Sequence, residues 1–200
     1  MRLCGKLVSR LASVSLLIGA SLGSEIVAAE APQLDSDGWH TWRTAAAEHA
    51  PEWCCFAWNQ GRKSAEGCDL DSERRGYGSS DQWLGRVDQV QLYVRTDGSR
   101  VAEIRALSPR CPVEADDGIA DLGVIASADS LEWLSGFVAP QNELTGDALA
   151  AISVHAQSVP TLIGVIRDRD LDMDTREEAL FWLAMNDSDD AMGFFEDLLL

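Results

Sequence analysis

Four cysteines in the first half of the chain restrict its fold more than any other feature. They are Cys54, Cys55, Cys68 and Cys111. Four thiols in an exported protein predict two disulfides. A bridge between the neighbours Cys54 and Cys55 is strained and rare, so each of these two is expected to bond either Cys68 or Cys111.

The disulfide prediction depends on export, for which the first 29 residues provide a signal. Its basic residues are Arg2, Lys6 and Arg10. An apolar segment follows at 11–22, and Val27 and Ala29 place small residues before a cleavage site at Glu30. The apolar segment is shorter than the roughly 20 residues that cross a bilayer. We therefore expect cleavage, a periplasmic or secreted protein, and no stable membrane insertion afterwards; an uncleaved anchor is the alternative.

A zinc site is the alternative role for the cysteines, with His40 and His49 upstream as further ligands. The sequence has no CxxC spacing, and an oxidising compartment favours disulfides. We expect two disulfides rather than a metal.

Charge is distributed unevenly along the chain, whose formal net charge is −17. Residues 30–111 carry 10 basic and 13 acidic side chains, whereas residues 112–200 carry 3 and 19. Such acidity argues against binding to nucleic acid or to anionic membranes. A protein partner that meets the carboxyl-terminal half is expected to present a basic surface.

Residues 30–140 are predicted to form a disulfide-bonded α+β domain with an antiparallel hairpin. Residues 90–95 alternate apolar and polar side chains, an Asp-Gly pair supplies the turn, and residues 101–107 return. A third strand is expected at 119–125.

Two other segments of this domain have different patterns. From Asp37, a plausible N-cap, to His49, tryptophans and alanine recur at helical spacing until Pro51, which predicts a short helix. Residues 59–82 lack apolar periodicity and are expected to form a long loop held by Cys68.

The tryptophan-rich region permits two interpretations. Five of the seven tryptophans fall between residues 39 and 83, and they can pack beside disulfides or form a platform for sugar stacking. If this region is a glycosidase site, Asp69, Asp71 and Glu73 are the nearby candidates for its two catalytic carboxylates. That mechanism depends on the distance in space between the two carboxyl groups. Core packing is the expected role.

Residues 145–200 are predicted to form two helical hairpins with a period of about 31 to 32 residues. One buried stripe is expected from Leu149, Ile152, Leu162, Ile166, Leu180, Leu183, Phe194 and Leu198. The expected capping residues of the helices are Asp129 with Glu132, Thr145, Ser158, Thr175 with Glu178, and finally Asp187 or Ser188.

Several motifs together resemble a family. They are WCC at 53–55, CDLD at 68–71, GYGSSD at 76–81, SPRCPV at 108–113 and the helical segment DTREEALFWLAM at 174–185. With the signal sequence, they resemble bacterial exported HEAT repeat domain-containing proteins. The resemblance implies a longer array of helical hairpins, and it carries no catalytic residues over to this chain.

An acidic segment resembles a calcium loop. Its alternating acids are Asp168, Asp170, Asp172 and Asp174. The sixth position from Asp168 is Met173 rather than glycine, and the twelfth is Ala179 rather than glutamate, so an EF-hand is excluded. A looser calcium site is the weaker alternative to a solvated loop.

No nucleophile elbow or phosphate-binding glycine loop is present in the sequence, so we expect no nucleotide cofactor. The expected function is a non-enzymatic protein-interaction module that uses a helical surface. A carbohydrate-binding protein or hydrolase that uses the Trp-rich cysteine loop is the alternative.

Overall fold

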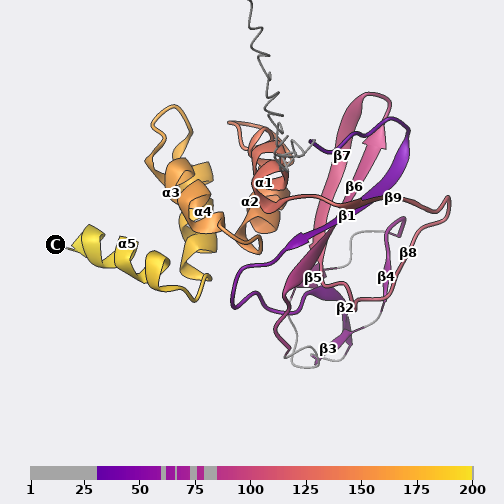
Figure 1. The fold of residues 1–200 in the computed structure, drawn as a ribbon, viewed down its shortest axis with the longest axis horizontal. Coiled ribbons are helices and arrows are strands. Elements are labelled where there is room, and N and C mark those ends of the chain that lie inside the picture. Colours follow the sequence, from indigo (N-terminus) through magenta and orange to yellow (C-terminus); the bar gives the residue numbers. More distant parts are fainter. Residues whose placement is uncertain (1–30, 60–61, 66, 73–75, 79–84, 200) are drawn as a thin grey trace, which may run out of the picture.

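The computed structural model describes residues 31–59, 62–65, 67–72, 76–78 and 85–199. Strands occupy the first half of the chain and helices the second, which confirms the predicted α+β class (Figure 1). The predicted signal sequence at 1–29 lies outside the described residues.

A four-stranded sheet lies at the centre, in the order β7-β6-β1-β9. Its strands are β1 (Gly38–Ala45), β6 (Gln89–Asp97), β7 (Arg100–Leu107) and β9 (Ile119–Val124). β6 pairs antiparallel with both β7 and β1, whereas β9 pairs parallel with β1. The predicted hairpin and third strand are therefore confirmed, and Gly98 takes the positive φ of 62° that its turn requires.

The predicted helix at 37–49 is wrong, because most of this segment is the strand β1. Trp39 and Trp42 are three residues apart, a spacing that is typical of one helical face. In the strand they point to opposite faces of the sheet, and both are buried. A strand that is buried on both faces has no polar alternation by which to recognise it.

Each face of the central sheet covers a separate core. Trp42, Leu92 and Ile104 pack on the helices, in one hydrophobic cluster with Leu149 and Leu183. This cluster crosses the predicted domain boundary between 140 and 145. On the opposite face, the buried hydrophobic residues are Trp39, Leu70, Tyr93, Leu107 and all four half-cystines. The molecule thus has a helical layer, a sheet and a cystine layer.

Short strands build the cystine layer. β2 (Cys54–Asn59) lies between β3 (Arg62–Ala65) and β5 (Gly76–Gly78), and β4 (Cys68–Asp69) pairs parallel with β8 (Val113–Glu114). The expectation of one long loop at 59–82 is therefore wrong within the described residues. Strands of two to four residues are too short to produce a periodic pattern.

The helices form successive layers away from the sheet (Figure 1). They are α1 (Ser127–Ser135), α2 (Thr145–Ser153), α3 (Ser158–Arg167), α4 (Met173–Ala184) and α5 (Asp189–Leu199). α1 and α2 contact the sheet, α3 and α4 pack beyond them, and α5 lies farthest away.

Most of the predicted helix caps are wrong by a few residues. The N-caps of α1, α2 and α3 are Ala126, Leu144 and Gln157, none of which makes a side-chain capping bond. Thr145 is instead the first helical residue, and its hydroxyl donates to the carbonyl of Ala139 at 2.9 Å. It therefore ties the loop before α2 to the helix.

Two further expected caps lie inside their helices rather than before them. Ser158 opens α3 and donates to the carbonyl of Ser153 at 3.3 Å. Asp129, the expected partner of Glu132, is the third residue of α1 rather than its cap.

The last two helices are capped by side chains. In α4 the cap is Asp172 rather than Thr175 with Glu178, since Asp172 accepts from the backbone N–H of Thr175 at 2.8 Å. Ser188 accepts from the backbone N–H of Ala191 at 3.3 Å, in agreement with one of the two residues expected to start α5.

Candidate functional site

Two disulfides join the cystine layer. Cys54 bonds Cys111 and Cys55 bonds Cys68, with Cα–Cα distances of 5.3 and 5.1 Å. The prediction of two disulfides is confirmed, and the structure selects one of the two pairings that the sequence left open. All four residues are buried.

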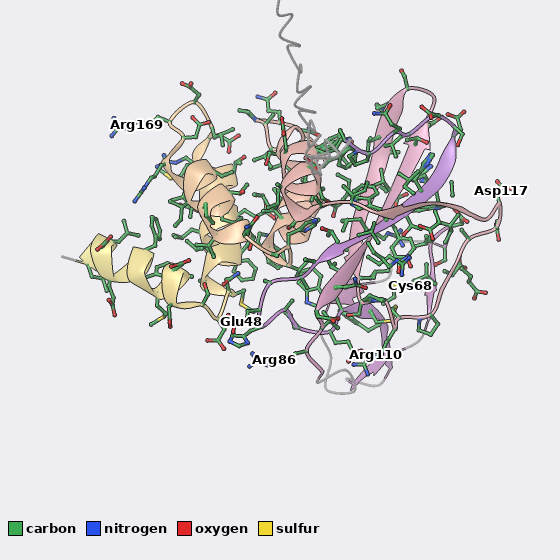
Figure 2. All side chains as sticks on the ribbon, viewed as in Figure 1. Glu48, Cys68, Arg86, Arg110, Asp117 and Arg169 are labelled. Carbon is green, nitrogen blue, oxygen red and sulfur yellow. A yellow bond between two sulfur atoms is a disulfide. The ribbon has the colours of Figure 1, made fainter. Side chains whose placement is uncertain are left out.

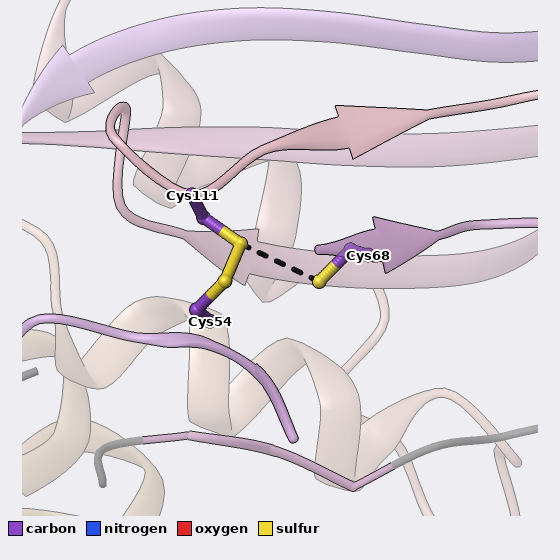
Figure 3. Close-up of side chains that lie close together, drawn as sticks. All are labelled: Cys54, Cys68 and Cys111. Atoms are coloured by element: carbon purple, nitrogen blue, oxygen red, sulfur yellow. Dashed lines mark hydrogen bonds between the residues drawn. A yellow bond between two sulfur atoms is a disulfide. The ribbon is translucent and has the colours of Figure 1, made fainter. Parts of the chain in front are cut away.

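The two disulfides touch each other. Cys68 Sγ lies 3.5 Å from Cys111 Sγ, although the two atoms belong to different disulfides (Figure 3). The sulfurs of Cys54, Cys68 and Cys111 lie within 4.8 Å of one another, a spacing compatible with a metal site. Each sulfur is bonded to another sulfur, however, so none is the thiolate that zinc binds.

The histidines of the zinc alternative lie away from the cysteines. Nε2 of buried His40 lies 2.8 Å from the carbonyl oxygen of Ser36, which can only accept, so the ring donates there. His49 is exposed in the segment before β2. The structure therefore does not bring the expected zinc ligands together.

The carboxylate of Asp71 holds the cystine layer against the sheet. It accepts from the indole N–H of Trp39 at 2.8 Å and from the backbone N–H of Asp116 at 2.7 Å. These two bonds, first the one from Asp116, lower the pKa of Asp71 below its usual value. Asp69 accepts from the backbone N–H of Asp71 instead of facing it as a second catalytic carboxylate, and Glu73 lies outside the described residues.

The tryptophans with described side chains in this region belong to the core. Trp39, Trp42 and Trp53 are buried, so they offer no open face for sugar stacking. The side chains of Trp58 and Trp83 lie outside the described residues.

A serine–histidine pair that the sequence did not reveal joins α1 to the end of α2. Ser130 Oγ lies 2.8 Å from Nε2 of His155, and it accepts from the indole N–H of Trp42 at 3.0 Å. Nδ1 of His155 donates to the carbonyl of Ala151 at 2.7 Å, so Nε2 is left to accept from the serine hydroxyl. Burial lowers the pKa of His155 to about 4, which keeps the ring neutral.

This pair resembles a catalytic nucleophile and its general base, but its surroundings indicate a structural role. Both residues are fully buried, so no substrate reaches the hydroxyl. The histidine is oriented by a backbone carbonyl rather than by a carboxylate. Its role is to link β1, α1 and α2.

The acids of the calcium-like segment serve the backbone around them. Asp168 accepts from the backbone N–H of Asp170 at 2.9 Å, and Asp172 caps α4. The bonds from Thr175 lower the pKa of Asp172. Asp170 and Asp174 are exposed.

The expected repeat stripe is buried near the sheet and open at the far end. Its fully buried or nearly buried members are Leu149, Ile152, Leu162, Leu183 and Phe194. Ile166 and Leu180 are half-buried. Leu198 is 60% exposed, so its inclusion in the stripe is wrong. Leu198 is exposed because it lies near the end of α5, and no other described helix packs against the outer side of α5.

Exposed apolar side chains gather on the last two helices. Six of the seven large hydrophobic residues that are exposed in the described structure lie between 173 and 199; the seventh is Val124. We call Phe181, Met185, Met192 and Leu198, which are between 56% and 65% exposed, the outer apolar residues. The same segment carries eight acidic side chains against Arg176 alone, a formal charge of −7.

Comparison of the chain with protein-family models, with curated proteins and with solved structures finds no significant match in any of the three. Among the described helices, none is long and apolar enough to span a membrane.

Proposed function

We propose that this chain is an exported, non-enzymatic protein-interaction module that binds a basic partner through α4 and α5. The proposal rests on one observation: the outer apolar residues lie in the segment 173–199, which carries a formal charge of −7. Exposed apolar groups among charged ones are typical of protein interaction sites.

The resemblance to HEAT repeat proteins supports this function, because stacked helical hairpins present extended surfaces to other proteins. The two disulfides support export, since such bonds persist in oxidising compartments such as the periplasm and the extracellular space. The carbohydrate alternative is less well supported, because Trp39, Trp42 and Trp53 are buried.

Capture from a cell-envelope extract at 50 mM and 500 mM salt tests the proposal. The immobilised full chain is expected to retain a basic protein at low salt and to lose most of it at high salt. At 500 mM salt the Debye length is about 4 Å, so the attraction between opposite charges is strongly screened. The triple variant Phe181→Ser, Met185→Ser, Met192→Ser is expected to lose the partner at both salt concentrations.

The matched control is Val124→Ser, which removes an equally exposed apolar side chain from β9 rather than from the helices. This variant should bind like the native chain. Retention of no protein, or of a protein that the triple variant still binds, would overturn the proposal.

A further inference from the structure

The sulfur atoms of Cys54, Cys68 and Cys111 meet inside the cystine layer. They lie within 4.8 Å of one another, and Cys68 Sγ is 3.5 Å from Cys111 Sγ. Three thiolates around one metal ion, each about 2.3 Å from it, lie about 4 Å apart. Reduction of both disulfides, followed by side-chain rotation that separates Cys54 Sγ from Cys111 Sγ, produces this spacing.

Backbone hydrogen bonds hold the three cysteines together independently of the disulfides. The N–H of Cys68 donates at 2.7 Å to the carbonyl of Pro112, which directly follows the last cysteine. The N–H of Cys111 donates to the carbonyl of Ser108 at 2.9 Å. The N–H of Ser108 donates at 2.8 Å to the carbonyl of Trp53, which directly precedes the first cysteine of the layer. We therefore expect the three positions to stay close together when the S–S bonds are opened.

One of the three sulfurs accepts a hydrogen bond from the backbone. The N–H of Cys55 donates to Cys68 Sγ at 3.0 Å. Such a bond stabilises a thiolate more than a neutral thiol, because the thiolate carries the negative charge. Hydrogen bonds to metal ligands also fix their orientation. This donor thus supports Cys68 as a metal-binding thiolate, whereas the sulfur of Cys55 is not one of the three that cluster.

The number and kind of ligands favour copper(I) as the metal. Thiolates are soft ligands that select copper(I), zinc or iron–sulfur clusters. Structural zinc sites are almost always four-coordinate, but no histidine or carboxylate of the described residues joins the three sulfurs. Copper(I) is satisfied by three thiolates. The three cysteines are at most 5% exposed, so the surrounding side chains keep water from a fourth position.

We infer that the reduced chain binds one copper(I) ion through Cys54, Cys68 and Cys111. Binding replaces the protons of three thiols by the metal and releases them to solvent, with no change in oxidation state. Formation of the two disulfides instead removes four electrons and four protons from four thiols, which a thiol oxidant must accept. A chain that is exported from a reducing cytosol carries thiols, so copper binding and disulfide formation compete for them.

The copper site is separate from the surface of the proposed function. Cys68 lies in the cystine layer, at the opposite end of the molecule from α5 (Figure 2, in the view of Figure 1). A failure of copper binding therefore leaves the proposed function standing. A failure of the capture experiment likewise leaves the copper site standing.

The test uses the full chain with Cys4→Ser, which removes the one cysteine outside the cystine layer. A phosphine reduces the disulfides and takes one oxygen atom from water for each disulfide opened. Under nitrogen, the reduced chain then competes with a coloured copper(I) chelator. We expect it to bind one ion, with three sulfur neighbours at about 2.3 Å in X-ray absorption. Binding by the oxidised chain, or a count of two or four sulfurs, overturns the inference.

Two further substitutions separate this site from general binding by thiols. Cys68→Ser removes a ligand and should weaken copper binding by about 100-fold or more. Cys55→Ser keeps the three ligands, so its affinity should stay within about threefold of the parent chain. Both substitutions remove the same disulfide from the oxidised protein, so their effects on folding are matched. Equal losses of affinity would contradict the three-sulfur site.

Folding of the reduced chain provides a second measurement, by far-ultraviolet circular dichroism and thermal unfolding. One equivalent of copper(I) should raise the melting temperature, or restore the native spectrum if reduction alone unfolds the chain, because metal binding then contributes folding free energy. A reduced chain that remains unfolded with copper(I) overturns the inference. Equal or greater stabilisation by one equivalent of zinc overturns the assignment of the metal.

Discussion

The hydroxyl of Ser130 lies 2.8 Å from Nε2 of His155, in a fully buried position between the sheet and the first two helices. The neutral histidine accepts from the serine and donates to the carbonyl of Ala151. Protonation of Nε2 would remove its lone pair and place a charge in the core. The stability of the molecule therefore depends on the protonation of one side chain.

His155 should make the fold less stable in mild acid. Its pKa is about 4 in the folded chain and about 6.5 in the unfolded chain. The unfolded state thus binds the proton first, and stability falls as the pH decreases from about 6.5 to 4, with a slope near 1.4 kcal/mol per pH unit. Below about pH 4 His155 is protonated in both states. The free energy of unfolding has then fallen by roughly 3 kcal/mol relative to neutral pH because of this residue.

Urea unfolding of the native chain and of His155→Gln between pH 4 and 7 measures this contribution. Glutamine can donate to Ala151 and accept from Ser130 but does not titrate. The difference in free energy of unfolding between the two proteins should narrow as the pH falls. A difference that is constant over this range would show that His155 does not control the acid response.

The contact between the two disulfides should permit exchange when one of them is opened. In Cys55→Ser, the thiolate of Cys68 lies 3.5 Å from Cys111 and can attack it, which forms a Cys68–Cys111 disulfide and releases the thiolate of Cys54. Alkylation and peptide mapping should then find the free thiol on both Cys68 and Cys54.

The control for exchange is Cys68→Ser, which removes the sulfur atom that contacts Cys111 of the other disulfide. Its free thiol should remain on Cys55, with the bond between Cys54 and Cys111 intact. If the label in Cys55→Ser stays on Cys68 alone, the observed contact does not lead to exchange.

Leu183→Ala should destabilise the chain, whereas Phe181→Ala should not. The two residues are on α4, but Leu183 is fully buried and Phe181 is 56% exposed. Loss of the buried side chain is expected to cost about 2–5 kcal/mol, and loss of the exposed one less than about 0.5 kcal/mol. Chemical denaturation measures both. Equal effects would contradict the orientation of α4.

Arg105→Met should cost about 1–2 kcal/mol, because the guanidinium is buried in the cystine layer. It lies 2.8 Å from Glu103, donates to the carbonyl of Leu70 at 3.3 Å and stacks 5.3 Å over Trp39. Glu103 keeps a second partner, so the cost should be smaller than for an ion pair that leaves one charge unpaired.

The control for this substitution is Arg100→Met in the same strand, where the side chain is exposed. It should change the melting temperature by no more than about 1 °C. A comparable loss in both variants would indicate that strand propensity rather than the buried contacts sets the cost.

Local patterns in the sequence predict the elements whose apolar residues recur at a regular spacing and are bounded by clear turn residues. The hairpin of β6 and β7 carries an Asp-Gly turn between alternating residues, and the carboxyl-terminal helices have helical periodicity. β1 could not be recognised in this way, because its tryptophans Trp39 and Trp42 are three residues apart, a spacing typical of a helix. The pairing of the disulfides depends on how β2, β4 and β8 meet, which no local pattern encodes.

The candidate site was predictable only in outline. The acidity of the carboxyl-terminal half and its apolar residues are visible in the sequence, but which of them face water depends on the stacking of α5. The rings of Trp53 and Trp182, residues 129 positions apart, lie in contact with a 5.7 Å distance between centroids, so this contact depends on the tertiary fold. The pair of Ser130 and His155 likewise comes from separate elements.

The two disulfides enclose rings of very different size, and this difference sets an order for oxidative folding. Cys55 and Cys68 are 13 residues apart, whereas Cys54 and Cys111 are 57 apart, with the whole β6–β7 hairpin between them. Closing the larger ring costs about 1.3 kcal/mol more in chain entropy. The smaller ring therefore forms first during oxidation, and the larger one closes after the hairpin has brought Cys111 back to its partner.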